Sequence, residues 1–374
     1  MKFNTTSKAF CSLPFEKLKV DPSGFVTMCC FQQRKCLGNI LDSSLDDIWA
    51  GDLAQEIRRT TSEGQLHTVC QIESCPFFHK SATKLPKDVW NFRYPADWEI
   101  DMPTQHCNIG GETPNKDNPA CLMCERHLRF EYQPNRLKEV CEKLKPYIRH
   151  VRSIHIQGVA EAFWKDLIFE VLDDLDVSNH KNHICVSTTT NGTILHEARR
   201  RRWLRYPTSI LTWSIDAASA ETYQLIRRVP MYHRIVDNLL AYARERRAPA
   251  QELRIHNNIN LLNIHEVEGM VELAAKAGAS IDFNPTYAVP LIAVDQNNVK
   301  LFQEAEGKII EAGKRLGVPV TFLRKLTLDF NPNLPTKSSQ TPIEEIIQAA
   351  DLLSIPVSKL LDSLKHTGGF IPFL

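Results

Sequence analysis

The chain has 374 residues, which is too long for one average domain, and its 43% hydrophobic content is enough for a packed core. Its 45 Lys and Arg nearly balance 44 Asp and Glu, so charge favours neither nucleic acid nor an anionic membrane as partner. The one long basic run, residues 199–202, is expected on a solvated helix face. No apolar stretch approaches the roughly 20 residues that span a bilayer, and residues 1–8 lack a signal-peptide apolar segment. We therefore expect a cytoplasmic protein whose eleven cysteines are mainly metal ligands.

The first 85 residues form a cysteine-rich segment, which predicts a small separate domain. The segment holds six cysteines, at positions 11, 29, 30, 36, 70 and 75, whereas none follows Cys185. Two short alternating runs around Pro22-Ser23-Gly24 predict a β-hairpin over residues 17–29. Helices are expected after Ser44, a plausible N-cap, and through residues 53–58.

Strand and helix patterns alternate from about residue 97 to residue 323. Strands are predicted at 98–102, 151–156, 184–189, 210–215, 253–259 and 281–283. Helices are predicted at 137–147, 164–175, 194–204, 232–246, 265–277 and 299–316. This alternation predicts a parallel sheet with covering helices, whose functional side chains gather at the carboxyl ends of the strands. Residues 332–342 are typical of a linker, and short helices are expected within 343–364.

Polar segments follow successive predicted strands. Cys107, Cys121 and Cys124 form a C-x13-C-x2-C arrangement after the first strand. Three soft thiolates favour an iron-sulfur cluster or zinc and leave one coordination position open for chemistry. Further polar segments lie at residues 157–161, 188–192, 213–216 and 256–258, at the ends of the next four strands.

In this order, the segments resemble the core of the radical S-adenosylmethionine (radical SAM) enzymes. The resemblance implies an α/β protein with a partial (β/α)6 TIM-type barrel over residues 86–328. A small cysteine-rich β-hairpin/helix domain over 1–85 precedes the barrel, and a linker and helical tail over 329–374 follow it. It implies that Cys107, Cys121 and Cys124 hold a [4Fe-4S] cluster that binds S-adenosylmethionine (SAM). The residues implied to contact SAM are Gly158, Ala160, Glu161, Asn191, Ser214, Asp216, Arg228 and Asn257.

Several of these residues also have a structural interpretation. Glu161 fits a carboxylate at a helix N-terminus, and Asn191 and Asn257 fit ordinary turn residues. Arg228 fits a solvated arginine on a helix. The pair Cys121-x2-Cys124 fits a zinc knuckle as well as part of a cluster site.

The N-terminal segment resembles the twitch or SPASM auxiliary-cluster domains of radical SAM enzymes. The resemblance is carried by Cys11, by the Gly24-x4-Cys29 spacing, by Leu37-Gly-Asn-Ile40, by Ser44-Leu45 with Ile48-Trp49, by Ile57-Arg58 and by the last cysteine pair. It implies an auxiliary [4Fe-4S] cluster held by Cys11, Cys29, Cys70 and Cys75. Cys30 and Cys36 are spare, and either is an alternative to Cys29. Structural zinc is the alternative metal, because four thiolates also satisfy tetrahedral zinc.

The resemblance implies reductive cleavage of SAM to a 5′-deoxyadenosyl radical, which abstracts hydrogen from a substrate C–H bond. We expect oxidation, dehydrogenation or epimerisation of a small polar, sugar-like molecule, with modification of a peptide by crosslinking or epimerisation as the alternative. Epimerisation needs a thiol donor, for which Cys30, Cys36, Cys141 and Cys185 are unassigned. An electron donor such as flavodoxin or ferredoxin is the expected partner. The alternative of another class is a non-catalytic zinc-binding interaction protein.

Overall fold

The computed structural model describes residues 11–29, 32, 35–65, 67–70, 94–102, 121, 136–157, 161–179, 183–286 and 298–323. These residues belong to two compact units. The first unit draws on residues 1–106, 131–188 and 206–209, and the second draws on residues 107–130, 189–205 and 210–374. The predicted domain boundaries at residues 85 and 328 lie outside the described residues and stay predictions.

A hairpin begins the first unit. Its elements are α1 (Leu13–Glu16), β1 (Lys17–Val20), β2 (Phe25–Thr27) and β3 (Gly38–Asn39). Antiparallel pairing joins β1 to β2 and β2 to β3. The Asp21 carboxylate closes the first turn by accepting the backbone N–H groups of Ser23 at 2.9 Å and Phe25 at 3.0 Å. Gly24 has a φ of 90°, which strains any residue with a side chain. The predicted hairpin is therefore confirmed.

Two helices follow the hairpin, α2 (Leu45–Ala50) and α3 (Asp52–Ser62). Ser44 Oγ accepts the backbone N–H of Asp47 at 3.1 Å, so the predicted N-cap is confirmed. Arg58 on α3 donates to the carbonyl of Pro14 at 2.9 Å and to that of Trp49 at 2.7 Å. Burial lowers the pKa of Arg58 to about 10, which leaves the guanidinium charged at neutral pH. One arginine thus ties the two helices to the start of the hairpin.

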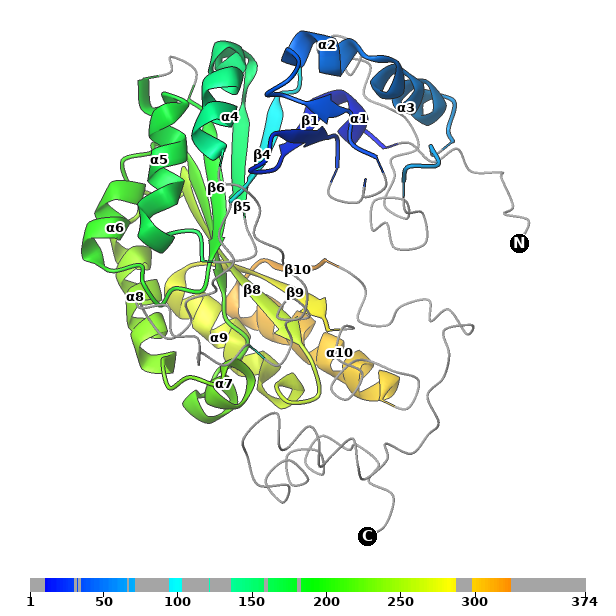
Figure 1. The fold of residues 1–374 in the computed structure, drawn as a ribbon. Helices are drawn as coiled ribbons and strands as arrows, with labels where there is room; N and C mark the ends of the chain where they lie inside the picture. The colour runs from blue at the N-terminus through cyan, green and yellow to red at the C-terminus, as the bar shows by residue number, and fades with distance from the viewer. Residues whose placement is uncertain are drawn as a thin grey trace. The chain divides into compact units, whose positions relative to one another are not determined.

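The parallel strands of the first unit are β4 (Asp97–Asp101), β5 (Ser153–Gln157) and β6 (Cys185–Thr190). Neighbouring strands follow the order β6-β5-β4-β1-β2-β3, and β1 pairs with β4 in parallel. The connections contain α4 (Leu137–Leu144) and α5 (Leu167–Asp174), which lie alongside these strands (Figure 1), with 3-10 turns at 145–150, 164–166 and 177–179. The N-terminal hairpin therefore extends the parallel strands through β1.

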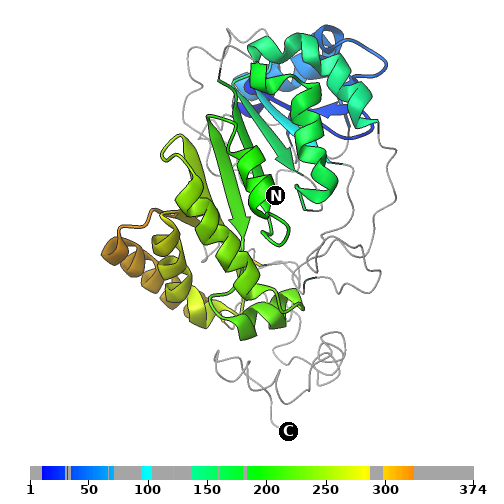
Figure 2. The same cartoon turned by 90° about the vertical axis from the view of Figure 1, so that its left-hand side faces the viewer.

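The second unit repeats the strand and helix alternation. Its strands are β7 (Ser209–Ser214), β8 (Gln251–Ile259), β9 (Ser280–Pro285) and β10 (Val320–Phe322), in the order β10-β9-β8-β7. β8 pairs with β9 and β9 with β10, both in parallel. Helices cover one face of these strands (Figures 1 and 2): α6 (Glu197–Trp203), α7 (Ala220–Arg227), α8 (Tyr232–Glu245), α9 (Val267–Ala277) and α10 (Val299–Leu316). The predicted α/β class and its run of parallel strands with covering helices are confirmed.

Burial alternates strictly along β8. Leu253, Ile255 and Ile259 are buried, while Arg254 and His256 on the other face are half-buried. A strand whose one face packs against helices has this period of two. The second, half-exposed face is therefore the one whose side chains are available to a ligand.

The basic run at 199–202 differs from the expectation of a wholly solvated face. Arg200 is buried, and it pairs with Glu245 at 2.9 Å and donates to Asn238 Oδ1 at 3.2 Å. Helical periodicity turns this one arginine of the run toward α8.

Among the described residues, no helix is long and apolar enough to cross a membrane.

Candidate functional site

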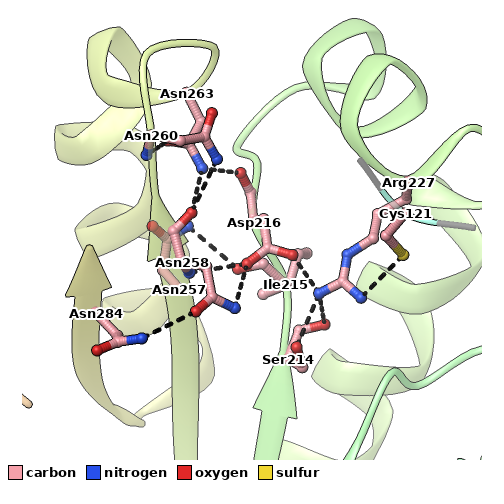
Figure 3. A network of polar contacts seen from close by, with 10 residues as sticks. All are labelled: Cys121, Ser214, Ile215, Asp216, Arg227, Asn257, Asn258, Asn260, Asn263 and Asn284. Carbon is pink, nitrogen blue, oxygen red and sulfur yellow. Dashed lines mark hydrogen bonds and ion pairs between the residues drawn. The ribbon is translucent and has the colours of Figure 1, made fainter. Parts of the chain in front are cut away.

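A buried carboxylate follows strand β7. Asp216 is fully buried, and its Oδ1 atom accepts the backbone N–H of Asn258 at 2.8 Å and the Asn258 side-chain amide at 3.4 Å. Its Oδ2 atom forms an ion pair with Arg227. Both carboxylate oxygens therefore interact with protein groups, one on β8 and one on α7 (Figure 3).

Arg227 is the last residue of α7 and connects this carboxylate to a cysteine. Its buried guanidinium donates from Nη2 to Ser214 Oγ at 2.8 Å and to the Ser214 carbonyl at 3.4 Å. Nη1 donates to the sulfur of Cys121 at 3.6 Å. Figure 3 shows the guanidinium between the end of β7 and this sulfur. A neighbouring guanidinium favours the thiolate, the form in which cysteine binds metal.

The start of α7 is fixed by one acidic side chain. Ser219 is its N-cap and accepts the backbone N–H of Thr222 at 3.2 Å. Glu266 accepts the backbone N–H of Ala218 at 2.7 Å, that of Ser219 at 3.3 Å, and the hydroxyls of Ser219 and Thr222. These bonds satisfy N–H groups that a helix start leaves without intrahelical partners. The helix that carries Arg227 is thereby attached to the 3-10 turn at Ile264–Glu266, directly before α9.

The turn after β8 belongs to the same network. Asn263 Nδ2 donates to the carbonyl of Asp216 at 2.7 Å and to that of Asn258 at 2.9 Å. Asn260 Nδ2 donates to the Asn258 carbonyl at 3.2 Å. Side-chain amides thus satisfy the backbone groups that the sheet leaves open where β7 and β8 end.

The two neighbouring asparagines of β8 have different environments. Asn257 is buried on the helix-covered face and donates to the carbonyl of Ile215 at 3.2 Å. Asn258 lies on the half-exposed face, where its Oδ1 accepts the amide of Asn284 on β9 at 3.3 Å. The geometry of Asn257 matches its structural interpretation, and its role as a SAM contact stays a prediction.

A histidine and a carboxylate lie two residues earlier on the same half-exposed face. His256 on β8 and Asp282 on β9 are register partners, and His256 Nδ1 forms an ion pair and hydrogen bond with Asp282. Burial alone would lower the pKa of His256, but the hydrogen bond and charge of Asp282 raise it above its usual value. This face therefore presents a titratable pair beside the Asp216 network.

A second ionic cluster lies on β1, β4 and β5 of the first unit. Lys19 donates to Glu99 at 2.9 Å and to Asp101 at 2.8 Å, and Lys17 pairs with Glu99 as well. Gln157 donates to Asp101 at 3.2 Å. Burial would raise the pKa of Glu99, but the two lysines lower it below its usual value. Buried Glu99 is therefore held as a carboxylate between two cations.

Two other predicted SAM contacts occupy structural positions. Asn191 is buried and closes the turn after β6, because its Oδ1 accepts Thr193 N at 2.9 Å and Thr193 Oγ1 at 2.6 Å. Glu161, in the first unit, is buried and accepts the backbone N–H of Phe163 at 3.3 Å, just before a 3-10 turn. Both geometries match the structural interpretation, and the roles of Asn191 and Glu161 as SAM contacts stay predictions. Gly158 and Ala160 lie outside the described residues.

Arg228 differs from its neighbour Arg227. It is the C-cap of α7 with a left-handed φ of 64°, and its side chain is half-buried. The arginine that joins Ser214, Asp216 and Cys121 is Arg227, which the sequence analysis did not single out. The role of Arg228 as a SAM contact stays a prediction.

The predicted metal ligands are described only in part. Cys75, Cys107 and Cys124 lie outside the described residues, and the described ranges contain no group of three or more His, Cys, Asp or Glu placed for one metal ion. Cys29 and Cys70 lie close to the same residue, because Gln32 donates its backbone N–H to the Cys29 carbonyl at 3.1 Å and forms an antiparallel bridge with Cys70. Cys11, half-buried, directly precedes the N-cap of α1.

Comparison with known proteins identifies the N-terminal segment. Residues 11–76 match the family model of SPASM, an iron-sulfur cluster-binding domain. This match confirms the predicted resemblance of the N-terminal segment to SPASM domains. No curated protein sequence matches the chain.

Solved structures similar to the chain include three radical-SAM-related or SAM-bound proteins. Streptococcus suis SuiB bound to S-adenosylmethionine has 10% identity and a TM-score of 0.44, with 82% of this chain and 69% of SuiB covered. Native anSMEcpe with bound AdoMet and Cp18Cys peptide has 13% identity and a TM-score of 0.45, with 61% and 63% covered. A radical SAM methyltransferase from Sphaerobacter thermophilus has 13% identity and a TM-score of 0.40, with 55% and 62% covered. The chain thus spans less than two thirds of the latter two proteins.

The residues missed by the sequence analysis carried one usable signal. Leu253, Ile255 and Ile259 place the odd-numbered positions of β8 on the covered face, so strand alternation assigns Asn258 to the open face. The amide of Asn263 had no such signal, because one of its partners, the carbonyl of Asp216, is 47 positions away in the chain.

Proposed function

We propose that the chain is a radical SAM enzyme with a SPASM-like auxiliary iron-sulfur domain. Cys107, Cys121 and Cys124 hold the [4Fe-4S] cluster that binds SAM, and Cys11, Cys29, Cys70 and Cys75 hold the auxiliary cluster. The observation that carries the proposal is the network in which Cys121 contacts Arg227, which in turn holds Ser214 and Asp216 at the end of a parallel strand. The SPASM match over residues 11–76 supports the auxiliary cluster.

The residues present fit these groups chemically. Cysteine thiolates are the ligands of [4Fe-4S] clusters, and the guanidinium beside Cys121 favours the thiolate form. The approach of Cys29 and Cys70 around Gln32 brings together ligands that are distant in sequence. Ser214 and Asp216 stay the proposed ribose contacts. The Ser214 hydroxyl is half-buried, and the fully buried Asp216 pairs with Arg227 beside it.

When bound, SAM and its reduced cluster supply a 5′-deoxyadenosyl radical that takes a hydrogen atom from a substrate C–H bond. The chain positions the substrate and excludes water from the reacting atoms. A cluster held by Cys11, Cys29, Cys70 and Cys75 would supply an acceptor for the electron left on the substrate, which suits an oxidation. We therefore propose oxidation or dehydrogenation, with epimerisation as the alternative outcome.

A small polar, sugar-like molecule is the proposed substrate, with a peptide residue as the alternative. The support comes from the half-exposed face of β8 and β9, which presents the imidazole of His256, the carboxylate of Asp282 and the amides of Asn258 and Asn284. Donors and acceptors of this kind suit hydroxyl groups. Cys141 is a poor hydrogen donor to a substrate, because it is buried in the packing of α4.

Metal content tests the proposal against the zinc alternative. Protein purified without oxygen is expected to be brown, with broad iron-sulfur absorption and iron for two [4Fe-4S] clusters. Addition of a reductant and SAM should then give methionine and 5′-deoxyadenosine. A colourless protein with stoichiometric zinc would contradict the proposal and support a non-catalytic zinc-binding protein.

Two sets of cysteine variants separate the roles of the clusters. Alanine at Cys107, Cys121 and Cys124 should abolish cleavage of SAM, because these residues hold the cluster with the open position. Alanine at Cys11, Cys29, Cys70 and Cys75 should remove the iron of one cluster and leave some 5′-deoxyadenosine formation. SAM cleavage that survives in the first variant would refute the assignment.

A further inference from the structure

Arg227 contacts two kinds of group through two arms of one guanidinium. Nη2 interacts with Ser214 and Asp216 at the end of β7, whereas Nη1 donates to the sulfur of Cys121 at 3.6 Å. We propose that Arg227 is a positioning residue that holds the Cys121 sulfur and, by donating a hydrogen bond to it, raises the reduction potential of the cluster ligated there. The inference rests on the proposed function, because it requires a cluster at Cys121.

The direction of the guanidinium is fixed by buried partners. Asp216 is fully buried and is itself held by Asn258 through the backbone N–H at 2.8 Å. The planar fork of arginine keeps its N–H groups at set angles, so engagement of Nη2 by Ser214 and Asp216 directs Nη1 toward the sulfur. Figure 3 shows this line of groups from Asn284 through Asn258, Asp216 and Arg227 to Cys121. A lysine has no second arm and does not reproduce it.

The backbone that carries Arg227 is anchored as well. Glu266 holds the first turn of α7 through Ala218, Ser219 and Thr222. α7 spans only Ala220–Arg227, so its last residue lies about two turns from that anchor. The helix therefore has little freedom to withdraw the guanidinium from the sulfur.

The effect expected on the cluster follows from charge. Each one-electron reduction adds negative charge to the irons and their sulfur ligands, and hydrogen bonds to the sulfurs are among the factors that set cluster potentials. The carboxylate of Asp216 lies against the same guanidinium and offsets its positive charge. The effect on the reduction potential therefore comes mainly from the hydrogen bond to the sulfur. Removal of the donor should make the cluster harder to reduce.

Four variants of the full-length chain test the inference. Arg227→Lys keeps a charge without the fork. Arg227→Met with Asp216→Asn removes both charges together, so that neither is left buried alone, and Asp216→Asn by itself is its reference. Arg201→Met is the matched control, because Arg201 is an exposed arginine of the same unit, paired with Glu197 on the surface of α6.

The measurement is a redox titration of oxygen-free protein monitored by electron paramagnetic resonance, with and without SAM. The signal that changes on addition of SAM belongs to the barrel cluster. The double variant should shift the reduction equilibrium of this cluster at least tenfold toward the oxidised form relative to Asp216→Asn, which corresponds to about 59 mV for one electron. Arg227→Lys should shift it in the same direction, and Arg201→Met should leave it unchanged.

The outcomes are separable. Potentials that stay unchanged in both Arg227 variants would overturn the inference. If an Arg227 variant loses the SAM-responsive cluster while its cluster-free form unfolds in urea like the wild type, a role in holding Cys121 is supported. Equal loss of the cluster and of stability would assign Arg227 to the fold and overturn the inference. A SAM-responsive signal that persists in Cys121→Ala would instead refute the proposed function.

Discussion

Replacement of Asp216 by alanine should destabilise the second unit strongly. Asp216 is fully buried, and Arg227, its partner, has only 8% of its side chain exposed. The substitution leaves the guanidinium without its carboxylate and the backbone N–H of Asn258 without its acceptor. Removal of one partner of a buried ion pair costs about 3–5 kcal/mol, so we expect a loss of that size in the free energy of unfolding.

Glu252→Ala is the matched control. Glu252 pairs with Arg254 on β8, but these side chains are 41% and 43% exposed, and such surface pairs contribute about 0–1 kcal/mol. The assay is urea unfolding of the cluster-free chain, followed by circular dichroism and tryptophan fluorescence so that separate transitions of the two units are detected. Addition of Arg227→Met should restore part of the stability lost in Asp216→Ala, because neither charge is then unpaired. A loss below about 1 kcal/mol in Asp216→Ala would refute this reasoning.

Three further outcomes follow from the packing and the titrating groups. Gly192→Ala should lower the free energy of unfolding in urea by roughly 1–3 kcal/mol, because Gly192 has a φ of 76° and a Cβ there would lie 2.5 Å or less from the Trp213 ring. The control is Gly307→Ala, in open space on α10, which should be neutral or stabilising. Burial raises the pKa of Cys141 to about 12, so its thiol should resist alkylation in native protein at pH 8, as checked by mass spectrometry of alkylated peptides. The free energy of unfolding should also fall as pH rises from about 9 toward 12, as checked by urea midpoints. The pKa of His256 is raised, against the effect of burial, by its carboxylate partner on β9, so its contribution to stability is complete below about pH 6.5 and is lost as pH rises through the folded pKa. His256→Gln should flatten this dependence, and parallel pH profiles of urea midpoints for wild type and variant would contradict it.

The secondary structure was largely predictable because its signals are local. The predicted helix at 299–316 coincides with α10, and the predicted strands at 210–215 and 253–259 overlap β7 and β8. The turn at Gly24 and the N-cap at Ser44 were also predictable, since each depends on residues within a few positions. Helix α7 and strand β10 were not among the predicted elements, because both are short and lack a long periodic pattern.

The polar network around Asp216 contains the chain neighbours of two residues that the sequence singled out. The sequence placed polar groups at the ends of β7 and β8, but it singled out Asn257 and Arg228, whereas Asn258 and Arg227 interact with Asp216. Adjacent residues of a strand face opposite sides, and adjacent residues of a helix point about 100° apart. A motif read along the chain identifies the segment, while the orientation of the backbone decides which neighbour faces the site.

The sequence by itself determined the cysteine-rich segment, the order of strands and helices, and the polar strand ends, because each of these features depends on residues that are close together in the chain. Only the tertiary structure brought Cys121 to Arg227 across 106 positions and Cys70 to Gln32 beside Cys29. It also placed β1 of the hairpin in parallel with β4. Contacts of this kind depend on which strands pair and which helix faces are buried, and these are set by the free energy of packing the whole chain, since a local pattern fits many partners equally well.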